Sequence, residues 1–349
     1  MGDSLTKQQK IEALNAYHSC GGNKSAAARL LELPVGTYKA RLNRALEDPG
    51  VTAAEFERDP LPSELPTAEE LLKLREKEFD RKNTAENARK LVPVRVKLDG
   101  PIGILHLGDP HVDDPGTDIY ALQRHVRLIQ QTPGLFGANV GDLHNNWVGR
   151  LARLYAEQST TAQQAWVLVE WLVTSCDWLY LILGNHDCWT GAGNPIDWMR
   201  RGTIGVTEAH GARLALTFPN GKVVRINARH DFTGHSMWSP IHGAAKAVQM
   251  GWRDHILTCG HKHTSGFACL KCPATGLLSH AIRVAGYKIH DSYGKEKGLP
   301  NQNISPAFGT IIDPRFEDDD PRLIHTVYCP EHAADYLTWL RERYEKGIK

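Results

Sequence analysis

The pattern of hydrophobic and polar positions changes character near residue 92. Beyond that point, short apolar runs that end in polar turns alternate with stretches of helical periodicity. The apolar runs predict buried strands at residues 103–107, 135–140, 179–183, 223–228 and 255–259. The helical stretches lie at about 118–131, 152–176, 240–250 and 331–346. This alternation is typical of a layered α/β fold, and we predict one such domain over residues 96–349.

The first 47 residues predict a separate all-α unit of three short helices, at 8–17, 25–33 and 38–46. Gly21 and Gly22 end the first helix, and Asn23 is a good cap for the second. Residues 34–36 (Pro-Val-Gly) predict a turn, after which Thr37 would cap the third helix. Two helices joined by a short turn that contains glycine form a helix-turn-helix.

Positive charge gathers in this unit. Between residues 23 and 45 the basic side chains are Lys24, Arg29, Lys39, Arg41 and Arg44, against the single acidic Glu32, although the whole chain carries a net charge of only +1. Residues 22–42 resemble the Fis-type helix-turn-helix of bacterial DNA-binding proteins. The resemblance implies that residues 38–44 are the recognition helix and that Lys39, Arg41 and Arg44 contact DNA. The alternative is a helical accessory whose basic face is merely solvated.

Residues 48–95 predict a linker and a spacer helix. Residues 59–66 contain three prolines and cannot be helical throughout. Residues 67–91 form a charged helical run whose apolar positions fade after Phe79, which does not support a long coiled coil.

Each of the five predicted strands runs directly into side chains that bind metals. The clusters are Gly108-Asp109-Pro110-His111, Gly141-Asp142, Gly184-Asn185-His186-Asp187, Arg229-His230-Asp231 and Gly260-His261-Lys262-His263. Because ligands gather where the strands of an α/β sheet end, we expect these clusters to converge at one edge of one sheet. Carboxylate, amide and imidazole donors together suit Mn, Fe or Zn rather than Ca or a thiolate-bound zinc. The two oxygens of Asp142 make it the best candidate to bridge two ions.

The order of these motifs over residues 103–266 resembles the calcineurin-like metallophosphoesterase superfamily, including its phage and prophage members. The resemblance implies a β-sandwich flanked by helices, with two divalent ions, Mn above Fe, Zn or Ni, that activate a water for attack on phosphorus. It assigns Asp109, His111 and His263 to one ion, Asn185, His230 and His261 to the other, and Asp142 to both. It leaves His186 unligated near the scissile phosphate, as proton donor or charge stabiliser.

Several positions leave alternatives open. His235 and His242 compete with His230 as a ligand. Residues 141–146 lack the second Asp and the Arg of the protein phosphatases in this superfamily (Gly-Asp-x-x-Asp-Arg-Gly), which counts against a protein phosphatase and leaves His144 or Asn145 as substrate-facing candidates.

Two further sets of residues also leave alternatives open. A structural zinc and unpaired thiols are alternatives for the set Cys269, Cys272, Cys329 and His332. Rim or core packing and base stacking are alternatives for the four tryptophans that follow the ligand-bearing strands, Trp147, Trp189, Trp198 and Trp238.

The composition limits the class of protein. The most apolar window, residues 165–184, is broken by Glu170 and Asp177, so we expect no membrane span. Seven cysteines, an odd number, predict reduced thiols and a cytoplasmic location, in a bacterial cell or a phage-infected host.

We therefore expect a DNA-directed nuclease or phosphodiesterase. One alternative is a nucleotide or phosphomonoester phosphatase whose helical unit serves homo-oligomer assembly. The other is a DNA-binding regulator whose metal domain senses a ligand.

Overall fold

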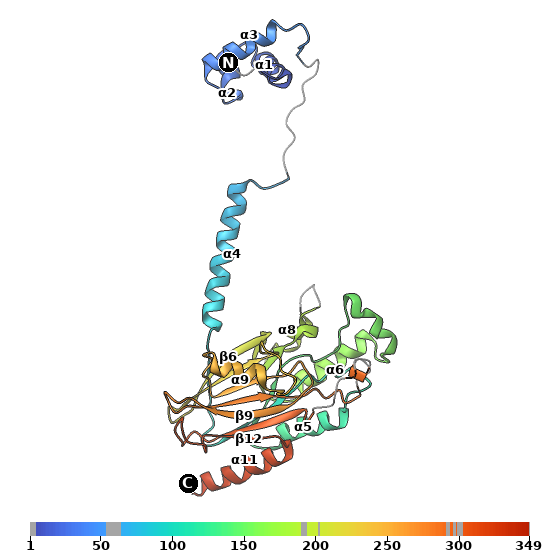
Figure 1. The fold of residues 1–349 in the computed structure, drawn as a ribbon, viewed down its shortest axis with the longest axis vertical. Helices are drawn as coiled ribbons and strands as arrows, with labels where there is room; N and C mark the ends of the chain where they lie inside the picture. Colours follow the sequence, from blue (N-terminus) through green and yellow to red (C-terminus); the bar gives the residue numbers. More distant parts are fainter. Residues whose placement is uncertain are drawn as a thin grey trace. The chain divides into compact units, whose positions relative to one another are not determined.

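The computed structural model describes residues 5–53, 64–189, 194–201, 203–290, 294–295, 298 and 303–348. The chain divides into two compact units, Met1–Lys77 and Glu78–Lys349, and the helix α4 (Ala68–Arg89) spans the division (Figure 1). No side chain of α4 is buried. In the parts of the chain that are described, no helix is long and apolar enough to cross a membrane.

The first unit is built from α1 (Lys7–Ser19), α2 (Lys24–Leu30) and α3 (Val35–Leu46). Its small core centres on Tyr38, which is fully buried and donates a hydrogen bond from its hydroxyl to the carbonyl oxygen of Ala13 at 2.9 Å. Asn23 caps α2 as predicted, because its side chain accepts from the amides of Ser25 and Ala26.

The start of α3 differs from the predicted one. The helix begins at Val35 directly after Pro34, so residues 35 and 36 are helical rather than part of a turn, and Thr37 does not cap it. Proline is tolerated at this position because its missing N–H would have no partner inside the helix. Helix α2 also ends earlier than predicted, at Leu30.

The second unit contains two six-stranded sheets. The strand order in one sheet is β1 (Val92–Arg95), β6 (Gly211–Thr217), β7 (Val223–Arg229), β8 (Ile256–Cys259), β10 (Leu278–Arg283), β9 (Gly266–Lys271). The order in the other is β12 (Ile324–Val327), β11 (Ala307–Ile312), β2 (Ile102–Leu107), β3 (Leu135–Asn139), β4 (Trp178–Leu183), β5 (Val206–Ala209). The neighbours β2, β3 and β4 are parallel to one another, and so are β7, β8 and β10.

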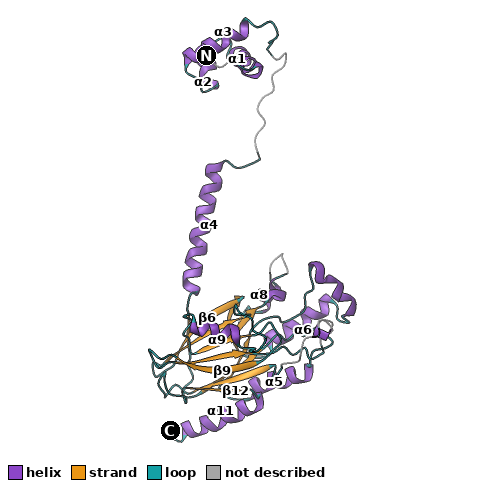
Figure 2. Cartoon of the chain, in the orientation of Figure 1, coloured by secondary structure: helices purple, strands orange, loops and turns teal. Residues whose placement is uncertain are grey.

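The two sheets pack face to face with helices on both outer sides. Ile104 of β2, Leu214 of β6 and Ile226 of β7 belong to one fully buried cluster between the sheets. Helices α5 (Ile119–Gln131), α6 (Ala162–Thr174) and α11 (Pro330–Glu345) cover the β2 sheet, and α9 (His242–Gln249) covers the other. Figures 1 and 2 show α9 and α11 on opposite sides of the strands. The predicted mixed α/β architecture with two layers of strands is therefore present.

Two sequence expectations are wrong. The five predicted strands do not lie in one sheet: β2, β3 and β4 belong to one sheet, and β7 and β8 to the other. The chain changes sheet at β6, which pairs antiparallel with β7 and buries alternate residues, as a one-sided hairpin does. The single helix predicted over 152–176 is instead a 3₁₀ helix, η1 (Gly149–Glu157), followed by α6, because Thr161 forms a new cap with Gln164.

A polar contact crosses the apolar interior at His106, on β2. Its Nδ1 lies 2.6 Å from the Tyr180 hydroxyl and its Nε2 lies 2.8 Å from Oγ1 of Thr310. Both ring nitrogens therefore have a hydrogen-bond partner while the ring is neutral. Burial lowers the pKa of His106 to about 3, from an ordinary value of 6.5. Between about pH 6.5 and pH 3, the ring is therefore neutral in the folded protein but protonated in the unfolded chain.

We predict that His106 contributes to acid sensitivity. Between pH 6.5 and 3 the unfolded chain binds a proton at this residue and the folded chain does not, so the free energy of unfolding falls as the pH falls. His106→Gln should reduce that slope by about one proton, on the order of 1 kcal/mol per pH unit. Urea unfolding at a series of pH values measures it, with exposed His332→Gln as the control. An equal slope in His106→Gln and the parent would contradict the prediction.

Candidate metal centre

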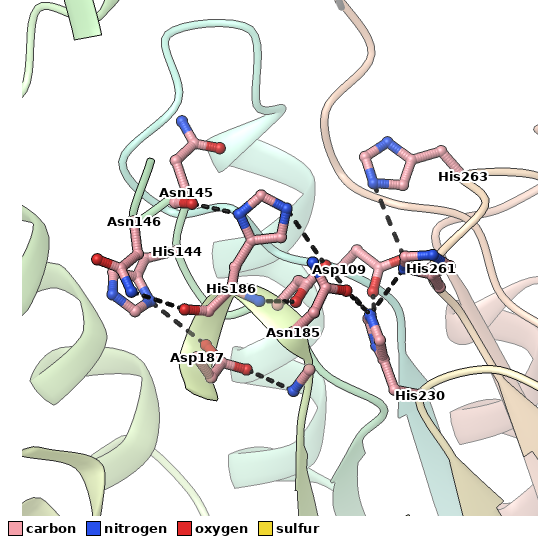
Figure 3. A network of polar contacts seen from close by, with 12 residues as sticks. Asp109, His144, Asn145, Asn146, Asn185, His186, Asp187, His230, His261 and His263 are labelled. Atoms are coloured by element: carbon pink, nitrogen blue, oxygen red, sulfur yellow. Dashed lines mark hydrogen bonds and ion pairs between the residues drawn. The ribbon is translucent and has the colours of Figure 1, made fainter. Parts of the chain in front are cut away.

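Segments from both sheets meet at the carboxyl ends of β2, β3, β4, β7 and β8. The seven side chains that the sequence assigned to metal follow these strands, and Figure 3 shows five of them, Asp109, Asn185, His230, His261 and His263, together with His186. Although the strands belong to different sheets, distances of 3 to 4 Å join side chains across the two, for example 3.2 Å between Nε2 of His230 and Oδ2 of Asp142. The convergence that the motifs predicted is present, but it lies between two sheets rather than along one.

Asp142 lies at the centre of this cluster. Its Oδ1 accepts a hydrogen bond from the backbone amide of His186 at 3.0 Å, and its Oδ2 faces His230. Among the described residues, two groups of three place their ligand atoms within 4.8 Å of one another: His111, Asp142 and His186, and Asp142, His230 and His261. Asp142 is common to both groups, which is the arrangement that a bridging carboxylate requires.

Asp109 and His111 supply buried polar atoms that lack hydrogen-bond partners. The Asp109 side chain is fully buried, and its Oδ2 accepts from the backbone amide of His261 at 2.6 Å and lies 3.9 Å from Nε2 of His263. Its other oxygen, Oδ1, and Nδ1 of His111 have no hydrogen-bond partner. A buried lone pair left in this way costs free energy, and a bound cation would satisfy it. The donor set therefore fits a divalent metal.

The backbone is strained at the same residues. Only eight non-glycine residues of the described chain have positive φ, and five of them are predicted ligands: Asp109 (21°), His111 (39°), Asp142 (52°), His261 (67°) and His263 (49°). Such conformations are costly for residues with a Cβ and persist where the surrounding fold imposes them, most often at functional sites. The strain thus marks the ligand positions independently of their chemistry.

Two glycines allow the loops to approach one another. A Cβ at Gly141 would lie 2.3 Å from Nδ1 of His230, and a Cβ at Gly184 would lie 2.1 Å from Oδ1 of Asp142. Any larger residue at either position would separate the β3 loop from β4 or β7.

The charges in this cluster depend on one another. Burial raises the pKa of Asp109 to about 8, and the nearby Asp142 adds to the shift. Burial alone would lower the pKa of His230, but its hydrogen bond to Asp142 and the charges of both carboxylates raise it to about 10. Burial, together with His186 and His263, holds the pKa of His111 well below its usual range. The two carboxylates therefore require positive charge beside them, and a proton on His230 supplies it; metal binding generally releases such protons.

His230, rather than His235 or His242, reaches the cluster. It is buried, its Nδ1 donates to the carbonyl of Val140 at 2.9 Å, and its Nε2 lies 2.9 Å from Oδ1 of Asn185. In Figure 3 the rings of His230 and His261 lie next to each other, with 2.9 Å between Nε2 and Nδ1. His235 and His242 instead line the cleft beside the cluster.

The imidazole of His186 is held by its neighbours on one side only. Its Nδ1 donates to the carbonyl oxygen of Asn145, and Asn146 donates to its backbone oxygen at 2.7 Å. Its Nε2 lies 3.8 Å from Oδ2 of Asp142 and faces the cleft. This ring therefore has one nitrogen fixed by a backbone carbonyl and one that faces Asp142 and the cleft.

His144 and Asn145 are not substrate-facing side chains, contrary to that expectation. His144 is buried, with Nδ1 3.3 Å from Oδ1 of Asp187, and packs on Trp166. The Asn145 side chain is also buried and donates to Asp114 at 2.9 Å. Their role here is to support the loop behind His186.

Two residues of this region were missed by sequence reasoning. Asp187 accepts from the amides of Gly184 and Leu143, which ties the β4 loop to the β3 loop; its position in the first turn of a helix was a signal for such capping. Arg283, at the end of β10, is buried and donates to the carbonyl of Gly260 and to Asp231. A single arginine at the end of β10, a mixed polar and apolar strand that the sequence did not predict, gave no signal.

A cleft of about 1010 Å³ opens over the cluster. His111, Asp142, Asn185, His186, His261 and His263 line its floor, and Lys262, Lys288 and Lys295 add positive charge to its lining. The volume suits a substrate of nucleotide size. The cationic lining suits a phosphate.

The cysteines do not form a second metal site. Cys269 lies 3.8 Å from Nε2 of His280, Cys272 lies beside Arg253, and Cys329 precedes α11. Across the described residues, the groups with coordination geometry are the two named above, and neither contains a cysteine or His332.

Comparisons with known proteins add little. The sequence matches no protein-family model and no curated protein. A conserved protein of Streptococcus pneumoniae, a predicted phosphoesterase, resembles this chain with 12% identity and a TM-score of 0.29, covering 66% of this chain and 98% of that one. Vps29 of Chaetomium thermophilum does so with 12% identity and a TM-score of 0.32, covering 64% and 92%. At these TM-scores neither similarity determines the chemistry of this chain.

We predict that Gly184→Ala weakens metal binding. The added Cβ would displace the Asp142 carboxylate, and disturbing a ligand's support typically lowers metal affinity about 10- to 100-fold. Calorimetric titration with Mn²⁺ measures the change, and circular dichroism checks the fold. Gly36→Ala, where nothing lies within 4 Å of the new Cβ, is the control. Equal affinities in Gly184→Ala and the control would show that this loop does not hold the ion.

Proposed function

We propose that this protein is a two-metal phosphoesterase of the calcineurin-like metallophosphoesterase type that hydrolyses phosphodiester bonds in DNA. The observation that carries the proposal is the sharing of Asp142 between two groups of potential ligands beneath a cationic cleft. Asp109, His111 and His263 would hold one ion, and Asn185, His230 and His261 the other. The mixture of oxygen and imidazole donors favours Mn, with Fe, Zn or Ni as alternatives.

The protein's own residues would bind and protonate the substrate. Two divalent ions, when bound, would supply Lewis-acid stabilisation of the phosphoryl oxygens and a more acidic water nucleophile. The phosphate would be attracted by Lys262 and Lys288 in the cleft lining. As the water oxygen bonds to phosphorus and the ester P–O bond breaks, Nε2 of His186 would give a proton to the leaving oxygen. The carbonyl of Asn145 keeps that nitrogen pointed at the cleft by holding Nδ1.

Replacement of His186 and of Asp142 should have different consequences. His186→Ala should lower cleavage of thymidylyl-thymidine, whose alkoxide leaving oxygen needs a proton, about 10²- to 10⁴-fold while metal content is retained. It should slow bis(p-nitrophenyl) phosphate far less, because p-nitrophenolate leaves without a proton. Asp142→Asn should lose both metal and turnover, because the charge between the two ions is removed. Elemental analysis and initial rates with Mn²⁺ measure both. Since His186 also lies within reach of a metal, loss of metal in His186→Ala would make it a ligand and refute this assignment.

The target of the enzyme is the second part of the proposal. The solvent-facing side of α3 carries Gly36, Lys39, Ala40, Asn43 and Arg44, all exposed. Tyr38, Leu42 and Ala45 occupy the opposite, buried side. A face with small residues at its centre and cations at its margins suits entry into the major groove of DNA. Arg41 is less accessible, since its Nε is buried, so Lys39 and Arg44 are the better DNA contacts.

We predict that the helical unit accounts for part of the salt dependence of DNA binding. Each neutralised phosphate contributes about −0.9 to the log–log slope of affinity against salt, so Lys39→Ala with Arg44→Ala should flatten it by up to about two units. Fluorescence anisotropy on duplex DNA measures the slope, and exposed Lys7→Ala is the control. Hydrolysis of bis(p-nitrophenyl) phosphate should persist. An unchanged slope together with unchanged DNA cleavage would mean that the helical unit does not bind DNA and serves assembly instead. The substrate would then be a small phosphate ester.

A further inference from the structure

One side of the cleft is apolar and aromatic. Trp147, Trp189, Leu151 and Leu154 all line the cleft together with the metal cluster. Leu151 and Leu154 lie three residues apart in η1, and a 3₁₀ helix has three residues per turn, so both side chains project from one face. We call these four residues the apolar wall. The proposed hydrolysis of a phosphate does not require it.

The wall adjoins the reacting position directly. The ring centroids of Trp189 and Trp147 lie 4.3 Å and 5.2 Å from that of His186. A group bonded to the phosphate that His186 serves would therefore meet the wall. Nζ of Lys288 lies 5.4 Å from the Trp147 ring centroid and 2.9 Å from Oδ2 of Asp114, so this charge at the wall is paired with a carboxylate.

We propose that the cleft accepts a phosphate ester that bears a nucleobase, and that the base packs against the apolar wall. This inference rests on the proposed function and specifies the substrate class of the same site. A nucleotide combines a planar apolar base with an adjacent anion, which matches an aromatic wall beside a lysine. Base stacking of this kind tolerates any base, because every base has a π face. A phospholipid would place a flexible chain, rather than a planar group, next to the phosphate.

The test compares substrates that share one leaving group. With Mn²⁺ present, kcat/KM is measured for the p-nitrophenyl esters of methyl phosphate, hexyl phosphate and thymidine 5′-phosphate. We expect the thymidine ester to exceed the methyl ester by about 5- to 150-fold, the range that stacking of one base provides. The hexyl ester should gain less than the thymidine ester. Because all three release p-nitrophenol, these ratios are insensitive to defects in leaving-group protonation.

The decisive variant is Leu151→Ser with Leu154→Ser, since neither side chain is placed in the metal cluster. The thymidine-to-methyl ratio should fall severalfold but stay above unity, because Trp147 and Trp189 remain in the wall. Trp238→Leu is the matched control, because Trp238 is 92% exposed and does not line the cleft, and its ratio should equal that of the parent. A ratio near one in the parent, or an unchanged ratio in the double variant, would overturn the inference. If the hexyl ester gains as much as the thymidine ester, the wall recognises an aliphatic group rather than a base.

A binding measurement separates this inference from the proposed function. Quenching of tryptophan fluorescence reports the affinity for thymidine 5′-phosphate and for methyl phosphate without turnover. Suppose that no ester is hydrolysed, but thymidine 5′-phosphate binds more tightly than methyl phosphate and loses part of that advantage in the double variant. The proposed enzymatic function is then wrong, and the proposed base binding is supported. If the esters are hydrolysed at equal rates and the two phosphates bind equally, the proposed base binding is wrong and the proposed enzymatic function is supported.

Discussion

The burial of two carboxylates in one place is the constraint on which the site depends. Asp109 is fully buried and Asp142 almost so, and each disfavours the charge of the other. Three neighbours offset this: backbone amides of His186 and His261 donate to the two side chains, and His230 lies between them. A site with so much concentrated negative potential is costly as protein alone. Its arrangement makes physical sense as a receptor for cations.

The rigid sandwich is what makes such an arrangement sustainable. Left-handed backbone at five ligand positions would relax if the loops were free, but each follows a strand buried in the interior and is tied back by contacts such as those of Asp187 and Arg283. The absence of a Cβ at Gly141 and Gly184 lets these loops pack directly against Asp142 and His230. The packing of the two sheets therefore stabilises the strained backbone, the burial and the close charges of the cluster together.

The sequence predicted the parts that depend on local pattern and missed those that depend on tertiary pairing. Long apolar runs such as 135–140 and 179–183 are strands because no other conformation buries them so well. Short or half-buried strands, for example β5 and β6, carried too few apolar residues to be recognised. Whether β7 continued the first sheet or began a second could not be read from periodicity, because both arrangements bury the same residues. The prediction that the ligand motifs converge does not depend on this assignment, since the strand ends meet in either arrangement.

Chemistry and selectivity occupy structurally different parts of the second unit. The ligands lie on tight turns at strand ends, where a displacement of a few tenths of an ångström is opposed by backbone contacts. The apolar wall comes largely from residues 147–154, and the sequence wrongly predicted that one long helix begins at residue 152. Residues 147–154 supply no side chain to the two groups of potential ligands, whereas Asp142 lies earlier in the same segment between β3 and α6. On the proposed function, substrate preference would change through η1 while the metal cluster stays the same.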